Sequence, residues 1–270
     1  MLVLLPPSEG KADGGEGRPL DLDELSLPGL APARRAVLDE LVALCAGAED
    51  GADGAKAREV LGLSERQQGE VAKNARLLTA PARPAAEVYT GVLYDALDLA
   101  TLNAGARRRA ARSLLVFSGL WGAVGIEDRI PSYRCSGSVR LPGLGALGPY
   151  WRGPLGAELP AAAGEGLVLD LRSTAYAAMW KPAGEPAERT VTVRVLQSKT
   201  VDGVETRSVV SHFNKATKGR LVRALLEADA EPGTPAELAE ALTALGYTVE
   251  GPGPAQPGKP RRLDVVVTEL

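Results

Sequence analysis

Three mostly apolar runs along the chain predict the centre of a buried sheet. They occupy residues 1–5, 113–117 and 166–171, and the first is closed by Pro6 and Pro7. Apolar runs of this length without polar alternation are typical of strands that are covered on both faces. We therefore expect the residues that follow each run to lie at one edge of the sheet.

Alternating apolar and polar positions predict further strands in the second half of the chain. Residues 190–196 and 206–212 alternate, and Asp202-Gly203 between them favours a hairpin turn, so these two strands are expected to be antiparallel neighbours. This assignment places His212 on a strand. Residues 263–268 predict a last strand, at an edge or returning to the sheet.

Helical periodicity separates the predicted strands. The long stretch 130–166 is rich in Gly, Pro, Arg and Tyr and is predicted to be irregular and functional. Helices are predicted at 33–45, 55–62, 64–78, 213–228 and 235–244, with short helices within 84–102. The pattern indicates an α/β (α+β) protein, a single domain over 1–270 with a mixed, mostly buried central sheet flanked by helices.

Composition narrows the classes of function. The 270 residues carry a net charge of -3, so any binding of nucleic acid must use a local basic patch. Residues 1–7 are too few for a membrane span and lack the basic region of a secretory signal, which favours the cytoplasm and no membrane partner. With two cysteines and one histidine, we expect neither a metal site nor a cofactor.

The segment after the first strand has the groups needed to bind an anion. Ser8 and Lys11 flank Gly10, so a hydroxyl, an ammonium and backbone N–H groups could converge on an oxyanion at the end of the sheet. The spacing of a phosphate-binding P-loop is absent, and a plain solvated turn is an equal alternative.

Further hydroxyls and cations occur at or just after predicted strand ends, where open α/β sheets bind ligands. Arg134 could hold a phosphate or carboxylate bidentately, and Lys215 would add charge near the start of a helix that also carries Lys218. Surface ion pairing is the alternative for each. The group comprises Ser118, Tyr133, Arg134, Ser173, Tyr176, Lys215 and Lys218.

Three other residues have chemistry that the sequence leaves open. Asp170 lies mid-strand, and we favour a polar face of the sheet over a buried functional carboxylate. A neighbouring Arg134 could lower the pKa of the Cys135 thiol, but no second cysteine is near in sequence and we do not favour a peroxide-reactive thiolate. His212 has no second histidine as a co-ligand, so a packed side chain is favoured over a metal ligand.

The order of short motifs along nearly the whole chain resembles the YaaA peroxide-stress family. The resemblance implies a mixed α/β fold with a helix-hairpin-helix-like element, a positively charged cleft, binding of double-stranded DNA and a role against iron-driven peroxide damage. The motifs that carry it are Pro7 to Lys11, Val88 to Gly91, Phe117 to Gly122, Ser132 to Arg134, Leu169 to Tyr176, and Ser211 to Lys215 with Gly219.

The segment Tyr89-Thr90-Gly91 is the candidate for the DNA-binding hairpin. A glycine flanked by apolar residues between two short helices lets the backbone approach a phosphate closely. One glycine stands where two are usual, so a simple turn between helices is an equal alternative.

Two functions remain open from the sequence. The first is a cytoplasmic peroxide-stress protein that binds double-stranded DNA non-specifically through its backbone in a basic cleft. The second is an enzyme that acts on a small phosphorylated or nucleotide-like ligand in the same pocket, whose catalytic residues are unknown. Ala216 and Thr217 stand where more lysines would strengthen DNA binding, so the small anionic ligand is the alternative partner.

Overall fold

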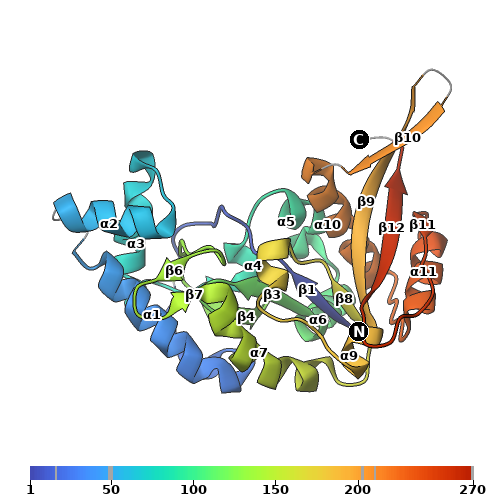
Figure 1. Ribbon diagram of the computed structural model, residues 1–270. Helices are drawn as coiled ribbons and strands as arrows, with labels where there is room; N and C mark the ends of the chain where they lie inside the picture. The colour runs from blue at the N-terminus through green and yellow to red at the C-terminus, as the bar shows by residue number, and fades with distance from the viewer. Residues whose placement is uncertain (16, 48–50, 202–203, 210, 269–270) are drawn as a thin grey trace.

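A mixed sheet forms the centre of the protein (Figure 1). The computed structural model describes residues 1–270 except 16, 48–50, 202–203, 210 and 269–270. Within that part of the chain, eight strands form one sheet in the order β11-β12-β9-β8-β1-β3-β4, and β10 pairs with β9 beside this path. The strands are β1 (Leu2–Leu5), β3 (Leu114–Ser118), β4 (Gly122–Gly125), β8 (Val168–Asp170), β9 (Thr190–Val201), β10 (Val204–Val209), β11 (Thr248–Glu250) and β12 (Arg261–Val267).

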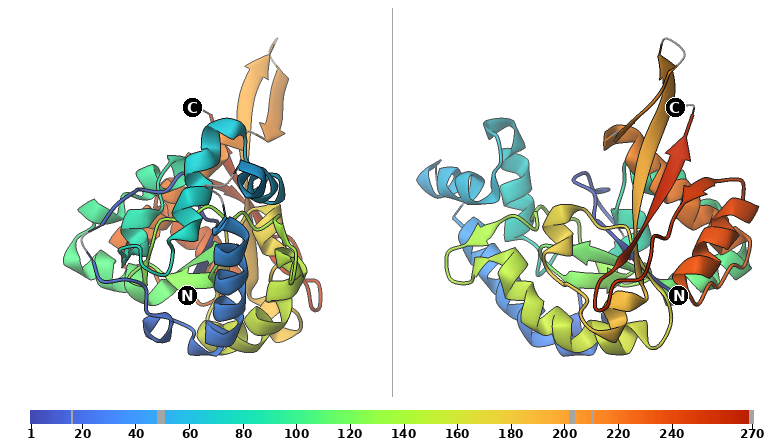
Figure 2. Two further views of the ribbon diagram at one scale, coloured as in Figure 1. Left: turned by 90° about the vertical axis from the view of Figure 1, so that its left-hand side faces the viewer. Right: turned by 45° about the vertical axis from the view of Figure 1, so that its right-hand side comes forward.

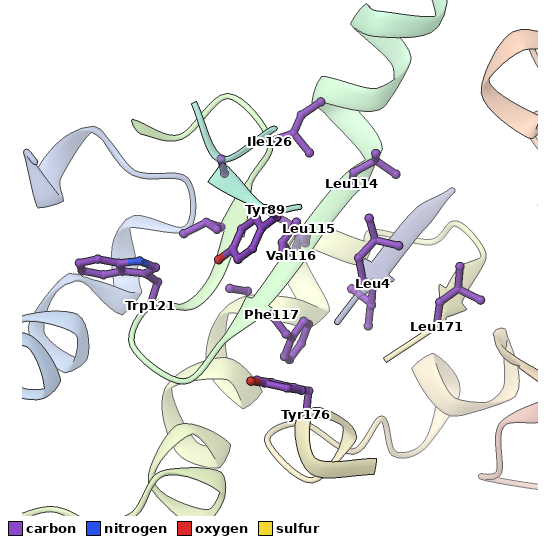
Figure 3. Close-up of a cluster of buried hydrophobic side chains, with 14 of the residues drawn as sticks. Leu4, Tyr89, Leu114, Leu115, Val116, Phe117, Trp121, Ile126, Leu171 and Tyr176 are labelled. Atoms are coloured by element: carbon purple, nitrogen blue, oxygen red, sulfur yellow. The ribbon is translucent and has the colours of Figure 1, made fainter. Parts of the chain in front are cut away.

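The three predicted apolar runs form neighbouring strands of this sheet. β1 lies between β3 and β8, pairs in parallel with both, and every residue of the three strands is buried. Leu4 pairs with Leu115 on one side and Asp170 on the other, and Leu4 and Phe117 belong to the buried core (Figure 3). The predicted α/β class with a mixed, buried sheet is confirmed.

Helices cover both faces of the sheet. Figures 1 and 2 show α1 and α7 on one side and α5, α6 and α10 on the other, and α10 packs against α5 and α6. The helices are α1 (Ala31–Cys45), α2 (Gly51–Leu61), α3 (Gln68–Ala75), α4 (Ala85–Val88), α5 (Val92–Leu97), α6 (Ala104–Ser113), α7 (Leu147–Ala163), α8 (Thr174–Ala177), α9 (Glu185–Glu188), α10 (Ser211–Glu227) and α11 (Pro235–Ala244). None of the described helices has the length and apolar character that crossing a membrane requires.

Helix α7 corrects the prediction of an irregular stretch over 130–166. It contains Pro154 and Pro160, which usually break helices because proline lacks an N–H and its ring meets a preceding carbonyl. Packing outweighs this cost, since an apolar stripe with a spacing of four residues is buried along the helix. The stripe consists of Leu147, Trp151, Leu155 and Leu159. The same stretch also contains β5 (Arg129–Ile130), β6 (Arg140–Leu141) and β7 (Gly145–Ala146), and β2 (Arg83–Pro84) pairs with β5.

The predicted hairpin of two antiparallel strands is confirmed as β9 and β10, although its boundary with the next helix is corrected. Helix α10 begins at Ser211, so His212 is helical and not on a strand; its side chain lies outside the described residues, as does the predicted turn Asp202-Gly203. Helix α3 is shorter than the predicted 64–78 because residues 65–67 form a separate 3-10 turn.

The outer half of this hairpin projects from the body. β8 pairs with Thr190 to Thr192 of β9, whereas β10 pairs with Leu196 to Val201, so β9 and β10 extend past the carboxyl end of β8. Figure 1 shows this arm on one side and α2 and α3 on the other, with the loop after β1 between them. The carboxyl ends of the central strands therefore face a region flanked by two projections.

Candidate functional site

A cavity of about 310 Å³ lies at the carboxyl end of β1. Its walls come from the loop after β1, from the start of α5, and from residues of α8 and α10 that are distant in the sequence. It brings together six residues that the sequence predicts as ligand-binding, namely Ser8, Thr90, Gly91, Ser173, Tyr176 and Lys215. The remaining lining residues are Pro6, Pro7, Glu9, Gly10, Val92, Leu93 and Tyr94.

Side-chain hydrogen bonds fix the loop after β1 against the segment before α5. The Ser8 hydroxyl donates to the Gly10 carbonyl (2.6 Å) and accepts from the Thr90 N–H (3.1 Å). The Tyr94 hydroxyl donates to the Pro6 carbonyl (2.7 Å). These bonds hold the two walls of the cavity at a fixed separation.

Close packing of α10 on α5 brings Lys215 to the cavity. A Cβ on Gly219 would lie 2.2 Å from the Leu93 carbonyl oxygen, so a glycine is required where the helices touch. Gly91 has φ +91°, a left-handed value that favours glycine, at the start of α5. Lys215, four residues before Gly219, is exposed on the rim of the cavity.

The rim and the wall of the cavity differ in their burial. Ser173 is exposed and its side chain does not cap α8. Tyr176 is buried, and its hydroxyl accepts from the Gly137 N–H (3.1 Å); burial raises the pKa of this phenol. An incoming ligand would therefore meet free hydroxyl and ammonium groups at the rim and an uncharged tyrosine at the wall.

Lys11 lies on the opposite side of the segment that forms the cavity wall. It forms an isolated antiparallel bridge with Tyr89, and residues that face one another in such a pair point to the same side. Gly10 and Thr90 point to the other side, where a Cβ on Gly10 would lie 3.3 Å from Thr90 Oγ1. Lys11 and Ser8 were predicted to bind one ligand, but they face opposite sides of the same segment.

A chain of buried hydroxyls lies beside Lys11, and we call Lys11, Tyr89, Tyr133 and Ser118 the inner cluster. The Tyr133 hydroxyl is 2.6 Å from Ser118 Oγ and 3.0 Å from the Tyr89 hydroxyl. Ser118 Oγ also accepts from the N–H groups of Leu120 (3.1 Å) and Trp121 (2.9 Å). Since these two bonds use both lone pairs, Ser118 donates its own hydrogen to Tyr133 and is not free to act as a nucleophile.

The Lys11 amine is held against aromatic rings. Its Nζ donates to the Ser8 carbonyl (3.0 Å) and lies 4.3 Å from the Tyr133 ring centroid and 5.8 Å from that of Tyr89. Burial lowers the pKa of Lys11 to about 8, with Glu9 raising it and Arg134 lowering it further. The Ser8 hydroxyl donates to the Gly10 carbonyl and Lys11 Nζ donates to the Ser8 carbonyl, so the two side chains do not form a nucleophilic serine–lysine pair.

Arg134, predicted as a clamp for an anion, binds a carboxylate of the protein itself. Its guanidinium pairs with Glu9 Oε2 (2.5 Å) and donates to the Glu9 carbonyl (2.8 Å). Its backbone is fixed by Asn74, which accepts from the Arg134 N–H (2.9 Å) and donates to its carbonyl (2.7 Å). Arg134 does not line the cavity, but Glu9 does, so the pair ties the cavity wall to the segment that follows Tyr133.

Lys218 is also outside the cavity. Its Nζ donates to the Leu171 carbonyl (3.5 Å), at the end of β8, and burial lowers its pKa. Lys218 therefore supports the site from behind and does not present its charge at the rim.

Asp170 corrects the prediction of a polar sheet face. It is 8% exposed, and its carboxylate pairs with Arg172 (2.6 Å), which is itself buried. The Arg172 guanidinium lies 4.3 Å from the Phe117 ring centroid and donates to the carbonyls of Tyr176 (3.2 Å) and Trp180 (3.0 Å). The pair has a structural role, because it fixes α8 and the following residues to the end of β8.

Neither cysteine has the environment of a peroxide-reactive thiolate. Cys45 and Cys135 are both free and buried, and burial raises the pKa of Cys135 to about 12 despite the nearby charge of Lys11. Burial also raises the pKa of the Cys45 thiol, to about 11. Both are therefore protonated at neutral pH.

Sequence reasoning missed two residues of the site, Glu9 and Tyr94. Glu9 stands inside the motif that first drew attention, between Ser8 and Gly10, and its partner Arg134 is 125 residues away. Tyr94 stacks on Tyr89 with centroids 5.5 Å apart. The spacing of these tyrosines around Gly91, in a chain with few aromatic residues, was a signal that could have found Tyr94.

Comparison with known proteins places this arrangement in a family. Residues 1–251 match the family model described as peroxide stress protein YaaA. A UPF0246 protein of Streptomyces coelicolor is 68% identical over 270 residues, covering all of both chains. A UPF0246 protein of Corynebacterium efficiens is 42% identical over 252 residues, 93% of this chain and 95% of the relative. An uncharacterized protein of Campylobacter jejuni is 24% identical over 82% of this chain and 83% of its own length. The chain belongs to the YaaA family of peroxide stress proteins, whose name supports a stress-related role.

Proposed function

We propose that this protein acts in the stress response by binding a small phosphate-bearing ligand in the cavity at the end of β1. The observation that carries the proposal is the convergence of Ser8, Thr90, Ser173, Tyr176 and Lys215 on one cavity of about 310 Å³. Hydroxyl groups and a lysine ammonium are the donors that a phosphate accepts from.

The size and charge of the cavity favour a compact ligand. A volume of about 310 Å³ is at the lower end of the range for small-molecule sites. The side chains of Thr90, Ser173 and Lys215 make no hydrogen bond or ion pair with any residue that the structure describes, so they are available to a ligand. Nearby cations are paired, Arg134 with Glu9 and Arg172 with Asp170, which leaves a local and not an extended positive surface.

Gly91 supports a second candidate, the non-specific binding of double-stranded DNA. It is exposed on the cavity wall, between α4 and α5, and a Cβ there would meet no atom within 4 Å. A phosphate of a nucleic acid backbone could therefore approach this peptide closely. The Asp95 carboxylate, which accepts from the Gly91 N–H (3.3 Å), opposes such an approach.

Calorimetric titration with a nucleoside, its mono- and triphosphates, and a random-sequence duplex tests both candidates. We expect the phosphorylated nucleosides to bind, and Lys215→Ala to weaken them about tenfold or more by removing a charge-assisted hydrogen bond. Lys259→Ala, an exposed lysine outside this cavity, is the matched control.

Each result decides between the candidates. Duplex binding that falls steeply with salt and needs Lys215 would favour DNA over the small ligand. Phosphorylated and plain nucleosides that bind equally, or binding that is unchanged in Lys215→Ala, would contradict the proposal.

A further inference from the structure

The side chains that line the cavity differ in polarity according to the element that supplies them. The α8 and α10 regions contribute the Ser173 hydroxyl and the Lys215 ammonium group, whereas the aliphatic side chains come from the loop after β1 and the start of α5. These aliphatic residues are Pro6, Pro7, Val92 and Leu93. A free phosphate ion has no group that can cover this aliphatic side. The cavity therefore suits a ligand with an apolar part as well as a phosphate.

The aliphatic side of the cavity is held in one conformation. Proline rings fix the backbone φ at Pro6 and Pro7, and the Pro6 carbonyl accepts from the Tyr94 hydroxyl (2.7 Å). The Tyr94 ring is stacked on that of Tyr89, with centroids 5.5 Å apart. Pro6, Pro7 and Val92 are only partly buried, so part of their surface is available to a ligand. A rigid organic group loses less conformational freedom on binding to such a surface than a flexible chain does.

The charges on the cavity lining match a single phosphate group. Among the described residues that line it, Lys215 is the only cation and Glu9 the only carboxylate. Glu9 is paired with Arg134 (2.5 Å), so the Arg134 guanidinium is already occupied. Each further phosphate on a ligand would bring negative charge toward Glu9 without meeting another free cation on this lining. The described lining therefore offers a chain of phosphates no advantage over one phosphate.

Lys215 and Val92 are close enough to contact one ligand. Helix α10 touches α5 where Gly219 meets the Leu93 carbonyl, and Leu93 follows Val92 in the chain. Lys215 is four residues before Gly219, which is roughly one helical turn, or about 6 Å, along α10. A phosphate at Lys215 therefore places the group attached to it beside Val92.

We propose that the cavity binds a phosphate monoester with one phosphate group and a flat, rigid organic part, as in a nucleoside monophosphate. This class of ligand rests on the phosphate binding of the proposed function, and it excludes sugar phosphates and polyphosphates as the preferred ligands. Lys215 and Ser173 bind the phosphate, and the base packs against Pro7 and Val92.

Calorimetric titration with adenosine 5′-monophosphate, ribose 5-phosphate and adenosine 5′-triphosphate, without divalent cations, tests the proposal. The first two share the phosphate and the sugar, so the difference between them isolates the base. We expect the monophosphate to bind at least about tenfold more tightly than ribose 5-phosphate, because only the base covers the aliphatic side. The triphosphate should bind no more tightly than the monophosphate, since the described lining has no second cation.

Two valines provide a matched pair of variants. Val92→Ala removes two methyl groups from the aliphatic side, so it should weaken adenosine 5′-monophosphate about fivefold and change ribose 5-phosphate by less than about twofold. Val42→Ala, at a partly buried valine of α1 outside this cavity, is the control and should change neither. If Val92→Ala does not fold, the affinities of the wild-type protein still decide the proposal.

Two outcomes would overturn the proposal and leave phosphate binding intact. In the first, ribose 5-phosphate binds as tightly as adenosine 5′-monophosphate, while both bind more tightly than adenosine. In the second, the triphosphate binds at least about tenfold more tightly than the monophosphate. Adenosine that binds as tightly as its monophosphate, or the absence of any binding, would instead overturn the proposed function and this class of ligand with it.

Discussion

The cavity and the inner cluster lie on opposite sides of the two short segments that the Lys11–Tyr89 bridge joins. They differ in how their polar groups are hydrogen-bonded. On the cavity side, Ser173 and Lys215 are exposed and make no bond to a described side chain. On the inner side, the Tyr133 hydroxyl is bonded to the hydroxyls of Ser118 and Tyr89, and Ser118 Oγ also accepts from two backbone N–H groups. Polar groups that are already satisfied hold a structure together, whereas polar groups left free at a rim can bind a ligand. The comparison teaches that residue type alone does not separate a supporting residue from a binding residue.

We expect the largest effect when two substitutions at the same end of the sheet are compared, one at the buried Arg172 and one at the exposed Lys215. Arg172→Met leaves the Asp170 carboxylate buried without its partner, so we expect the free energy of unfolding to fall by about 3–5 kcal/mol. Lys215→Met, at the exposed rim, should change it by less than about 0.5 kcal/mol. Urea denaturation measures both. Equal losses would show that the comparison between the two sides is wrong.

The pH dependence of stability should distinguish Lys11 from an ordinary lysine. Its pKa in the folded protein is about 8, below the usual 10.5, so the unfolded chain binds more protons between these values. Relative to Lys11→Met, the wild type should therefore gain stability as pH rises from about 8 to about 10.5, by at most about 3 kcal/mol. Buried tyrosines and thiols titrate in both proteins and cancel in the difference. A difference that stays flat over this range would place Lys11 in solvent.

Two serines offer a matched test of bonded and free hydroxyls. Ser118→Ala leaves the Leu120 and Trp121 N–H groups without their acceptor, and we expect a loss of about 1–3 kcal/mol. Ser173→Ala should change stability by less than about 0.5 kcal/mol while weakening the ligand. Thermal and urea unfolding report the first effect, and the nucleotide titration the second. A Ser118→Ala variant that keeps its stability, together with a Ser173→Ala variant that loses it, would contradict this assignment of bonded and free hydroxyls.

The smallest effect is expected at the cysteines. Cys135 is close enough to Lys11 to feel its charge, yet it is 4% exposed and its pKa is about 12. Treatment of the folded protein with dilute hydrogen peroxide or iodoacetamide should leave both thiols unmodified by mass, with modification on the order of 10²-fold faster in urea. Rapid oxidation of Cys135 in the folded protein would mean that the structure around the inner cluster opens to solvent.

The sequence predicts the centre of the fold because burial on both faces leaves a simple pattern. The runs at 1–5, 113–117 and 166–171 become β1, β3 and β8. The sequence does not predict helix α7 because Pro154 and Pro160 argue against a helix. The apolar stripe that stabilises the helix is recognised only if the four-residue spacing is given more weight than the prolines. His212 was misplaced because the alternating sequence pattern of residues 206–212 continues past the end of β10 into the first turn of α10.

The sequence predicts which residues belong to the candidate site, but not how their side chains are arranged in space. Ser8, Ser173, Tyr176 and Lys215 were expected near strand ends, Thr90 was expected in a hairpin between helices, and all five share a cavity. Ser118, Tyr133 and Lys11 were expected beside them but lie on the other side of the Lys11–Tyr89 bridge. That bridge joins residues 78 positions apart, and strand-end position alone does not say to which side a side chain turns.

The place of β12 in the sheet bears on how the protein is made. β12 is the last strand along the chain, yet it lies between β11 and β9 and aligns with β9 from Arg261 to Val267. During synthesis, therefore, that edge of β9 stays unpaired until residues 261–267 emerge, and an unpaired edge invites pairing with other chains. Until residues 261–267 are available, the nascent protein would then depend on a chaperone or on rapid pairing of β12 to protect this edge of β9.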